Sequence, residues 1–138
     1  MISIVIVTHG DFGKELLNSA ELIVGKQENV KTLSLNHGDN ISALQEKISK
    51  TIIELNKRYE VLVFTDLFGG SPANSAAINM ESLKFKCITG VNLPMLLEAL
   101  VSRLDENLDI DEIVGKCLEA GVDGIKNLEE IFLKGGEI

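Results

Sequence analysis

The segment that decides the fold is residues 2–11, ISIVIVTHGD, near the start of the chain. Residues 2–8 are short, rich in β-branched side chains and almost continuously apolar, which is typical of a strand buried on both faces of a parallel sheet. His9, Gly10 and Asp11 break this run, and a helical spacing of apolar residues follows. The segment therefore predicts a buried strand, a tight turn and a helix.

The same order of strand, turn and helix repeats along the chain. Further strands are predicted at residues 30–35, 60–65 and 84–89. Helices are predicted at residues 12–24, 41–55, 96–104 and 109–120, the last of which ends at Gly121. Another helix is predicted to begin after residue 70, with Ser71 as its cap. Such alternation with short links predicts an α/β fold with a doubly wound, mainly parallel sheet and helices on both faces. Residues 122–133 fit either a short strand or another helix. The 138 residues suit one domain, 1–138.

Composition and charge narrow the classes of function. Hydrophobic residues make up 45% of the chain, and the net charge is −8, with 13 basic residues that are scattered rather than grouped. Scattered basic residues give no electrostatic footprint for nucleic acid. No apolar run approaches the ~18 residues of a membrane span, and residues 2–7 lack the length and charged lead of a secretory signal. We therefore expect a cytoplasmic protein with no nucleic-acid partner.

The cysteines and the second histidine are interpreted as structural. Cys87 and Cys117 lie in apolar patterns with no histidine nearby. A metal centre needs a denser set of ligands, so no metal is expected, and both thiols are predicted to be small buried groups. His37 lies in a polar turn two residues before Asp39, a spacing without a metal signature, and is predicted to be a solvent-exposed turn residue.

Chemically distinctive residues follow three of the predicted strands. His9 follows the first strand, Asp66 follows the third, and the turn at residues 90–94 follows the fourth, while residues 69–71 lie beside Asp66 and open a helix. In parallel sheets, ligands bind beyond the carboxyl ends of the strands, where neighbouring connections diverge. We expect these loops to form one shared anion or phosphoryl site.

The residue types in these loops suit phosphoryl transfer. A histidine nitrogen is a nucleophile near neutral pH, and Asp66 would accept the proton of the other nitrogen of His9, fixing the tautomer and stabilising positive charge on the ring. Gly69 and Gly70 let the backbone approach a phosphate closely, and free amides at the helix start near Ser71 attract anions. Each feature alone has a structural explanation, but three at one sheet edge indicate a functional site.

Three motifs resemble a known family, the IIA component of the mannose family of the bacterial phosphoenolpyruvate-dependent sugar phosphotransferase system. They are residues 4–10 (IVIVTHG), 66–74 (DLFGGSPAN) and 90–96 (GVNLPML), and the resemblance covers about residues 1–130. It implies the strand order 2-1-3-4 and a further C-terminal strand, possible in residues 122–133, that is exchanged between the subunits of a homodimer.

The resemblance implies a phosphotransferase that acts through a phosphohistidine. A phosphorylated histidine-containing phosphocarrier protein would donate to Nε2 of His9, while Asp66 pairs with Nδ1 and residues Gly69, Gly70 and Ser71 line the phosphate site. His9 would pass the group to a histidine of a IIB component, which phosphorylates sugar entering through membrane permease subunits. The chain ends at Ile138 without a IIB domain, so a separate IIB chain is expected. No cofactor is implied.

The sequence also predicts docking residues and leaves alternative functions open. The apolar residues Phe12, Phe68, Leu93 and Met95 are predicted to form a docking patch, with packing into the core as the alternative for each. Two other functions stay open: a phosphorylation-sensitive regulatory or binding module, and a phosphoryl carrier subunit for dihydroxyacetone kinase. A histidine phosphatase or mutase is disfavoured, because those enzymes need a second catalytic histidine late in the chain, and none follows His37.

Overall fold

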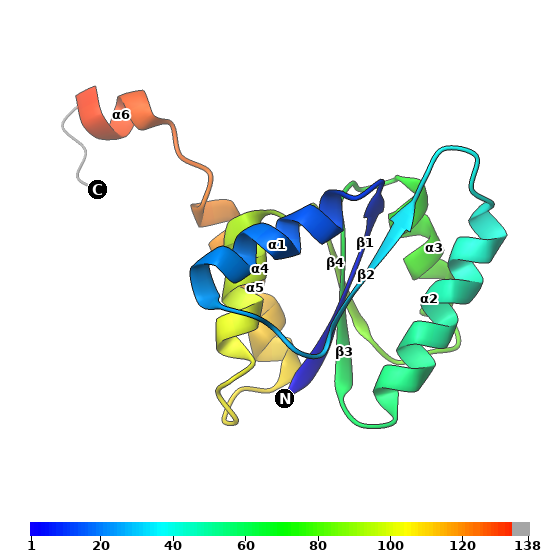
Figure 1. Ribbon diagram of the computed structural model, residues 1–138. Coiled ribbons are helices and arrows are strands. Elements are labelled where there is room, and N and C mark those ends of the chain that lie inside the picture. Colours follow the sequence, from blue (N-terminus) through cyan, green and yellow to red (C-terminus); the bar gives the residue numbers. More distant parts are fainter. Residues whose placement is uncertain (134–138) are drawn as a thin grey trace.

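The computed structural model describes residues 1–133 as a four-stranded parallel sheet between two layers of helices (Figure 1). In chain order the elements are β1 (Ile2–His9), α1 (Phe12–Val24), β2 (Val30–Leu35), α2 (Ile41–Asn56), β3 (Glu60–Thr65), α3 (Ser71–Asn79), β4 (Lys86–Thr89), α4 (Leu93–Ser102), α5 (Ile110–Asp123) and α6 (Leu128–Leu133). The strand order is β2-β1-β3-β4, and all three pairs are parallel. This confirms the predicted fold class and strand order.

The first strand is almost continuously apolar because each of its faces lies in a separate core. Ile4 and Ile6 belong to the core that contains side chains of α1, α4 and α5, whereas Val5 and Val7 belong to the core under α2 and α3. Figure 1 shows these two groups of helices on opposite sides of the sheet. A strand covered on both faces has no solvent side, so its sequence does not alternate between polar and apolar residues.

The carboxyl edge of β1 and β3 is the point where the chain connections diverge. β1 leads into α1 on one face of the sheet, and β3 leads into α3 on the other (Figure 1). The two strands are adjacent and in register, with Val7 opposite Thr65. His9, the last residue of β1, and Asp66, the residue after β3, are therefore brought to the same crevice, which is the usual ligand position in an open parallel sheet.

Several predicted boundaries differ from the structure, and the largest shift is that of α4, which spans Leu93–Ser102 rather than residues 96–104. β4 begins at Lys86 rather than at residue 84. Ser71 is the first residue of α3 and not its cap, because Gly70 occupies the N-cap position without a side-chain hydrogen bond. α5 continues past Gly121 to Asp123, since this glycine serves close packing against α4: a Cβ there would lie 2.7 Å from Cε of Met95.

The C-terminal part of the described chain is helical. Residues 122–133 hold the end of α5 and the short helix α6, which extends away from the sheet (Figure 1) and has no buried residue. The helix alternative therefore describes this segment, and the predicted C-terminal strand is not found in residues 1–133. Strand exchange and the homodimer stay predictions. None of the helices within these residues is long and apolar enough to cross a membrane.

Candidate active site

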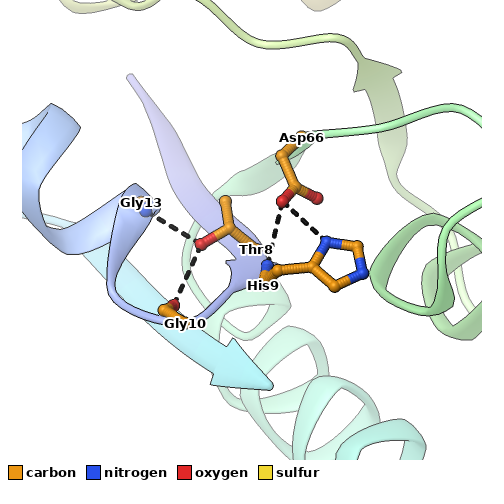
Figure 2. Close-up of polar contacts among 5 residues, drawn as sticks. All are labelled: Thr8, His9, Gly10, Gly13 and Asp66. Carbon is orange, nitrogen blue, oxygen red and sulfur yellow. Dashed lines mark hydrogen bonds and ion pairs between the residues drawn. The ribbon is translucent and has the colours of Figure 1, made fainter. Parts of the chain in front are cut away.

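His9 and Asp66 are in direct contact at the carboxyl edge of the sheet (Figure 2). Oδ2 of Asp66 lies 2.9 Å from Nδ1 of His9 and also accepts a hydrogen bond of 2.9 Å from the backbone N–H of His9. One carboxylate oxygen thus holds both the backbone and the ring of the histidine. The other ring nitrogen, Nε2, points away from the carboxylate in Figure 2.

The surroundings of the pair determine which ring nitrogen can react. The side chain of Asp66 is 13% exposed and that of His9 is 48% exposed. Because a carboxylate can only accept, the 2.9 Å contact assigns the ring proton of a neutral His9 to Nδ1. Nε2 then carries the free lone pair, on a half-exposed ring whose orientation is fixed. This is the arrangement of a nucleophile with an orienting acid residue.

Gly70 provides the close approach of backbone to the histidine ring. A Cβ at this position would lie 2.9 Å from Cε1 and 3.6 Å from Nε2 of His9. Its φ of −76° is open to any residue, so the requirement for glycine comes from space rather than from conformation. The neighbouring Gly69 differs, because its φ of +82° lies in the left-handed region and no atom crowds it within 4 Å.

The first turn of α3 adds hydrogen-bond donors beside this ring. Hydrogen bonding within the helix begins with the N–H of Asn74, which donates to the carbonyl of Gly70 at 2.9 Å. The N–H groups of Ser71 and Ala73 therefore have no partner inside the helix, and Pro72 has no N–H. Since Gly70 lies against His9, the positive end of the helix dipole is next to Nε2. An anion bound to Nε2 would be favourably placed.

Thr8 fixes the turn that follows the strand and was missed by sequence reasoning. It is fully buried, and its Oγ1 accepts from the N–H of Gly13 at 2.8 Å and donates to the carbonyl of Gly10 at 3.2 Å (Figure 2). Gly10 has a φ of +54° and donates its N–H to the carbonyl of Leu35 at 2.8 Å. The sequence feature that could have indicated this role of Thr8 is its hydroxyl group at the end of an otherwise apolar run.

The four predicted docking residues do not share one environment. Phe12 is 47% and Phe68 is 87% exposed, and both lie in segments that follow the strands of the site. Leu93 is partly buried and packs against the core of α1, α4 and α5. Met95 is 5% exposed and is part of that core, so it is corrected from a docking residue to a core residue.

A cavity of about 400 Å³ opens beside His9 on the side of the loop between β2 and α2. It is lined by His9, Gly10, Leu35, Asn36, His37, Gly38, Asp39 and Ile41. His37 is exposed, as the sequence predicted, but it lies at the edge of the site. Within residues 1–133 there is no group of three or more histidine, cysteine or carboxylate side chains that could hold a metal ion.

A larger cavity of about 490 Å³ lies at the amino-terminal edge of β3 and β4. Its lining residues are Asn56, Arg58, Tyr59, Glu60, Val61, Lys84, Phe85, Lys86 and Ile110. This lining has no histidine or thiol nucleophile held by a partner carboxylate. The smaller cavity beside the paired His9 is therefore the better candidate for group-transfer chemistry.

Curated relatives of the chain are components of sugar phosphotransferase systems. The mannose-specific EIIAB component of Escherichia coli (strain K12) is 40% identical over 129 residues, covering 93% of this chain. The chain spans 40% of the length of that relative. The fructose-specific EIIA component of Bacillus subtilis (strain 168) is 37% identical over 115 residues, which cover 83% of this chain and 77% of that protein.

Solved structures and a family model agree with these relatives. The phosphotransferase system component EIIA from Streptococcus agalactiae matches with a TM-score of 0.84 and 36% identity, covering 94% of this chain and 98% of that one. The mannose/sorbose specific IIA subunit from Enterococcus faecalis matches with a TM-score of 0.81 and 29% identity, covering 91% and 92%. The family model EIIA-man, described as PTS system fructose IIA component, matches residues 3–118. The chain therefore belongs to the mannose-type IIA component family of the sugar phosphotransferase system.

Proposed function

We propose that the chain is a phosphoryl carrier that accepts a phosphoryl group on Nε2 of His9 and passes it to a second protein. The observation that carries this proposal is the contact of 2.9 Å between Nδ1 of His9 and the largely buried Asp66. That contact leaves Nε2 beside Gly70 and the start of α3, where an anion is favoured. Membership of the IIA component family supports the same chemistry.

The proposed transfer exchanges one P–N bond for another. The lone pair on Nε2 of His9 attacks the phosphorus of a donor phosphohistidine as the donor P–N bond breaks, and the electron pair of that bond returns to the donor ring. The proton on Nδ1 stays donated to Asp66, whose negative charge stabilises the positive ring of the phosphorylated His9. Alignment of the two rings and charge stabilisation supply most of the catalysis in such in-line transfers.

The phosphate-binding part of the proposed site uses neutral donors. Gly69 and Gly70 admit the phosphoryl group close to the backbone, and the first-turn N–H groups and hydroxyl of Ser71 would bind its oxygens. The three motif loops contain no lysine or arginine. Helix-dipole interactions contribute only ~0.3–1 kcal/mol each. A group held in this way is bound but easily released, which a carrier requires.

The partners in this proposal are two proteins that present a histidine to the same site. The donor is the phosphorylated histidine-containing phosphocarrier protein, and the acceptor is a IIB component that serves membrane permease subunits for a sugar. The exposed rings of Phe12 and Phe68 offer apolar contact area for both at the edge of the site. Successive docking of two proteins on one exposed histidine fits the half-exposed ring of His9.

The decisive experiment measures phosphoryl acceptance by intact mass. The parent chain and His9→Ala are incubated with phosphoenolpyruvate, magnesium and the general phosphotransferase proteins, and a IIB component is then added. We expect one acid-labile phosphoryl group on the parent, none on the variant, and loss of the group when the IIB component is present. An unmodified parent beside a phosphorylated donor would contradict carrier function, and a modified His9→Ala would contradict the assigned residue. Retention of the group with the IIB component would favour a regulatory module.

A further inference from the structure

The turn between β1 and α1 carries His9, and its backbone is held from three directions. The N–H of His9 donates to Oδ2 of Asp66 at 2.9 Å, and the N–H of Gly10 donates to the carbonyl of Leu35 at 2.8 Å. The third contact comes from Thr8, whose Oγ1 donates to the carbonyl of Gly10 at 3.2 Å (Figure 2). Because the backbone has only two soft dihedrals per residue, anchoring successive peptide groups fixes the direction in which the side chain of His9 leaves the strand.

The same hydroxyl of Thr8 also anchors the start of α1. Asp11 occupies the N-cap position of this helix, but its side chain makes no capping hydrogen bond. Oγ1 of Thr8 accepts instead from the N–H of Gly13 at 2.8 Å. Such a bond satisfies one of the first-turn N–H groups that a helix leaves without a partner. One buried oxygen therefore joins the end of β1 to both the turn and the helix.

Gly13 permits this contact because the start of α1 lies directly on the strand. A Cβ at Gly13 would lie 2.8 Å from Cγ2 of Ile6 and 3.2 Å from Oγ1 of Thr8. A larger residue would push the helix away and lengthen the hydrogen bond from Gly13 to Thr8. The hydroxyl of Thr8 is thus used as donor and as acceptor, and its removal would take away the partner of one N–H and of one carbonyl.

Phosphoryl transfer needs the ring of His9 in one orientation. Nδ1 contacts Oδ2 of Asp66, while Nε2 lies beside Gly70 at the start of α3. The side chain of His9 is 48% exposed, so packing holds the ring on part of its surface only. Its position therefore depends on Asp66 and on the backbone of the turn. A misplacement of reacting groups by about 1 Å can cost about a hundredfold in rate.

We propose that the hydroxyl of Thr8 is a positioning group for His9. By fixing the turn that follows β1, it holds the ring with Nδ1 on Asp66 and Nε2 toward the start of α3. Thr8 does not touch the phosphoryl group and acts through the backbone of His9 and Gly10. This inference rests on the proposed phosphoryl-carrier function.

The first test compares phosphoryl acceptance by the parent, Thr8→Val and Thr8→Ser in a rapid-quench assay. Valine keeps the shape of threonine but removes the hydroxyl, so we expect acceptance to be slower by about tenfold or more. Serine keeps the hydroxyl and loses a methyl group, so it should retain most of the parent's rate in a less stable protein. If Thr8 served stability alone, folded Thr8→Val would accept the phosphoryl group at the parent's rate.

Nitrogen-15 NMR of the His9 ring supplies a readout that does not depend on a partner protein. At about pH 8.5 a free imidazole is neutral, and the parent should carry its ring proton on Nδ1, as the contact with Asp66 requires. In Thr8→Val we expect a mixture of the two ring tautomers, whereas Thr8→Ser should keep the parent's pattern. The signals of His9 are identified by their absence from His9→Ala.

Thr65→Val is the matched control, because Thr65 directly precedes Asp66 as Thr8 directly precedes His9. Thr65 is also fully buried, but its Oγ1 has no hydrogen-bond partner within residues 1–133. Thr65→Val should therefore keep the parent's rate and ring signals. If Thr8→Val does not fold, Gly13→Ala replaces it, because the added Cβ must displace the start of α1 from Thr8. We expect slower acceptance and a mixed ring signal from that variant too.

Three results would overturn the positioning role of Thr8. They are parent-like rates and ring signals in Thr8→Val or its replacement, an equal loss of rate in Thr8→Ser, and an equal loss of rate in Thr65→Val. If the parent still carries its phosphoryl group on His9 in these cases, the proposed function stands. A parent that accepts no phosphoryl group overturns the proposed function, and the positioning role in transfer falls with it.

Discussion

At the scale of single residues, the site depends on a carboxylate and a glycine that act on the same ring. Asp66 fixes the ring of His9 through Nδ1, and Gly70 leaves room for it on the opposite side. The local sequence around either residue does not show that it contacts His9. Both reach His9 because β3 pairs with β1 in a parallel register. We therefore expect different effects from substitutions of Asp66 and of Gly70.

Asp66→Asn should slow phosphoryl acceptance without unfolding the protein. The amide can still accept the N–H of His9, but it lacks the negative charge that stabilises the phosphorylated ring. Removing such an orienting partner typically costs about 10–100-fold. Rapid-quench rates measure the effect, and circular dichroism checks the fold. Equal rates for the variant and the parent would assign Asp66 a structural role.

Gly70→Ala and Gly69→Ala should separate catalysis from stability. The Cβ of Gly70→Ala would lie 2.9 Å from Cε1 of His9, so the ring must move, and acceptance should fall strongly while the fold stays stable. Gly69→Ala meets no atom within 4 Å but must adopt a φ of +82°, which costs roughly 1–2 kcal/mol of stability. Acceptance rates and urea unfolding of both variants test this. The reverse pattern would contradict the assigned roles.

At the scale of elements, Arg103 joins the end of α4 to the amino edge of the sheet. This buried guanidinium donates to the carbonyls of Ile2, Asn29 and Glu28 and to Oε1 of Gln27, at 2.7–3.3 Å. Burial lowers the pKa of Arg103. Its hydrogen bonds hold the loop between α1 and β2 against the start of β1, far from the site at the carboxyl edge.

Arg103→Met should therefore reduce stability and leave the chemistry intact. The methionine fills part of the space, but the carbonyl oxygens lose the N–H donors of Arg103, and that of Asn29 keeps only the N–H of Ile4. Each group left unpaired costs about 1–3 kcal/mol. Urea unfolding measures the loss, and phosphoryl acceptance should match the parent where the variant is folded. Arg58→Met is the control, because Arg58 is exposed and its guanidinium lies over the ring of Tyr59, 5.8 Å from the centroid. Similar losses of stability in the two variants would contradict the stabilising role of the Arg103 hydrogen bonds.

The sequence predicts the elements of the first half of the chain better than those of the second half. β1 and β3 are clear because burial on both faces gives nearly continuous apolar runs between turn residues. β2 has a weaker pattern, because it lies partly buried at the edge of the sheet and its sequence, VKTLSL, mixes polar and apolar residues. The end of α5 was misplaced because Gly121 serves packing against Met95, which local sequence does not reveal. His37 was correctly predicted to be an exposed turn residue, and the pairing of β1 with β2 brings its turn to the edge of the site.

At the scale of the whole molecule, the sheet separates two cores that each hold one cysteine. Cys117 on α5 is fully buried in the core of α1, α4 and α5, and Cys87 on β4 packs against the other core. Burial raises the pKa of Cys87 to about 11 and, together with Glu98, raises the pKa of Cys117 to about 12. Both thiols are therefore neutral and unreactive in the folded protein near neutral pH.

These raised pKa values predict how stability falls in alkaline solution. In the unfolded chain the thiols ionise near their ordinary pKa of 9.0, whereas in the folded chain they ionise near 11 and 12. Their contribution to stability is therefore complete below about pH 9 and is lost as the pH rises through the folded values. Each thiol lowers the free energy of unfolding by up to about 1.4 kcal/mol per pH unit within that window.

Cys87→Ala and Cys117→Ala should each remove one of these contributions. Each variant starts from a lower stability at neutral pH, because alanine leaves a cavity. Between about pH 9 and pH 11, however, its free energy of unfolding should fall less steeply with pH than that of the parent. Urea unfolding across this range measures the slopes, and the ionisation of lysine and Tyr59, common to all three proteins, cancels in the comparison. Parallel slopes would mean that both thiols ionise in the folded state as readily as in the unfolded chain, so that each core admits solvent.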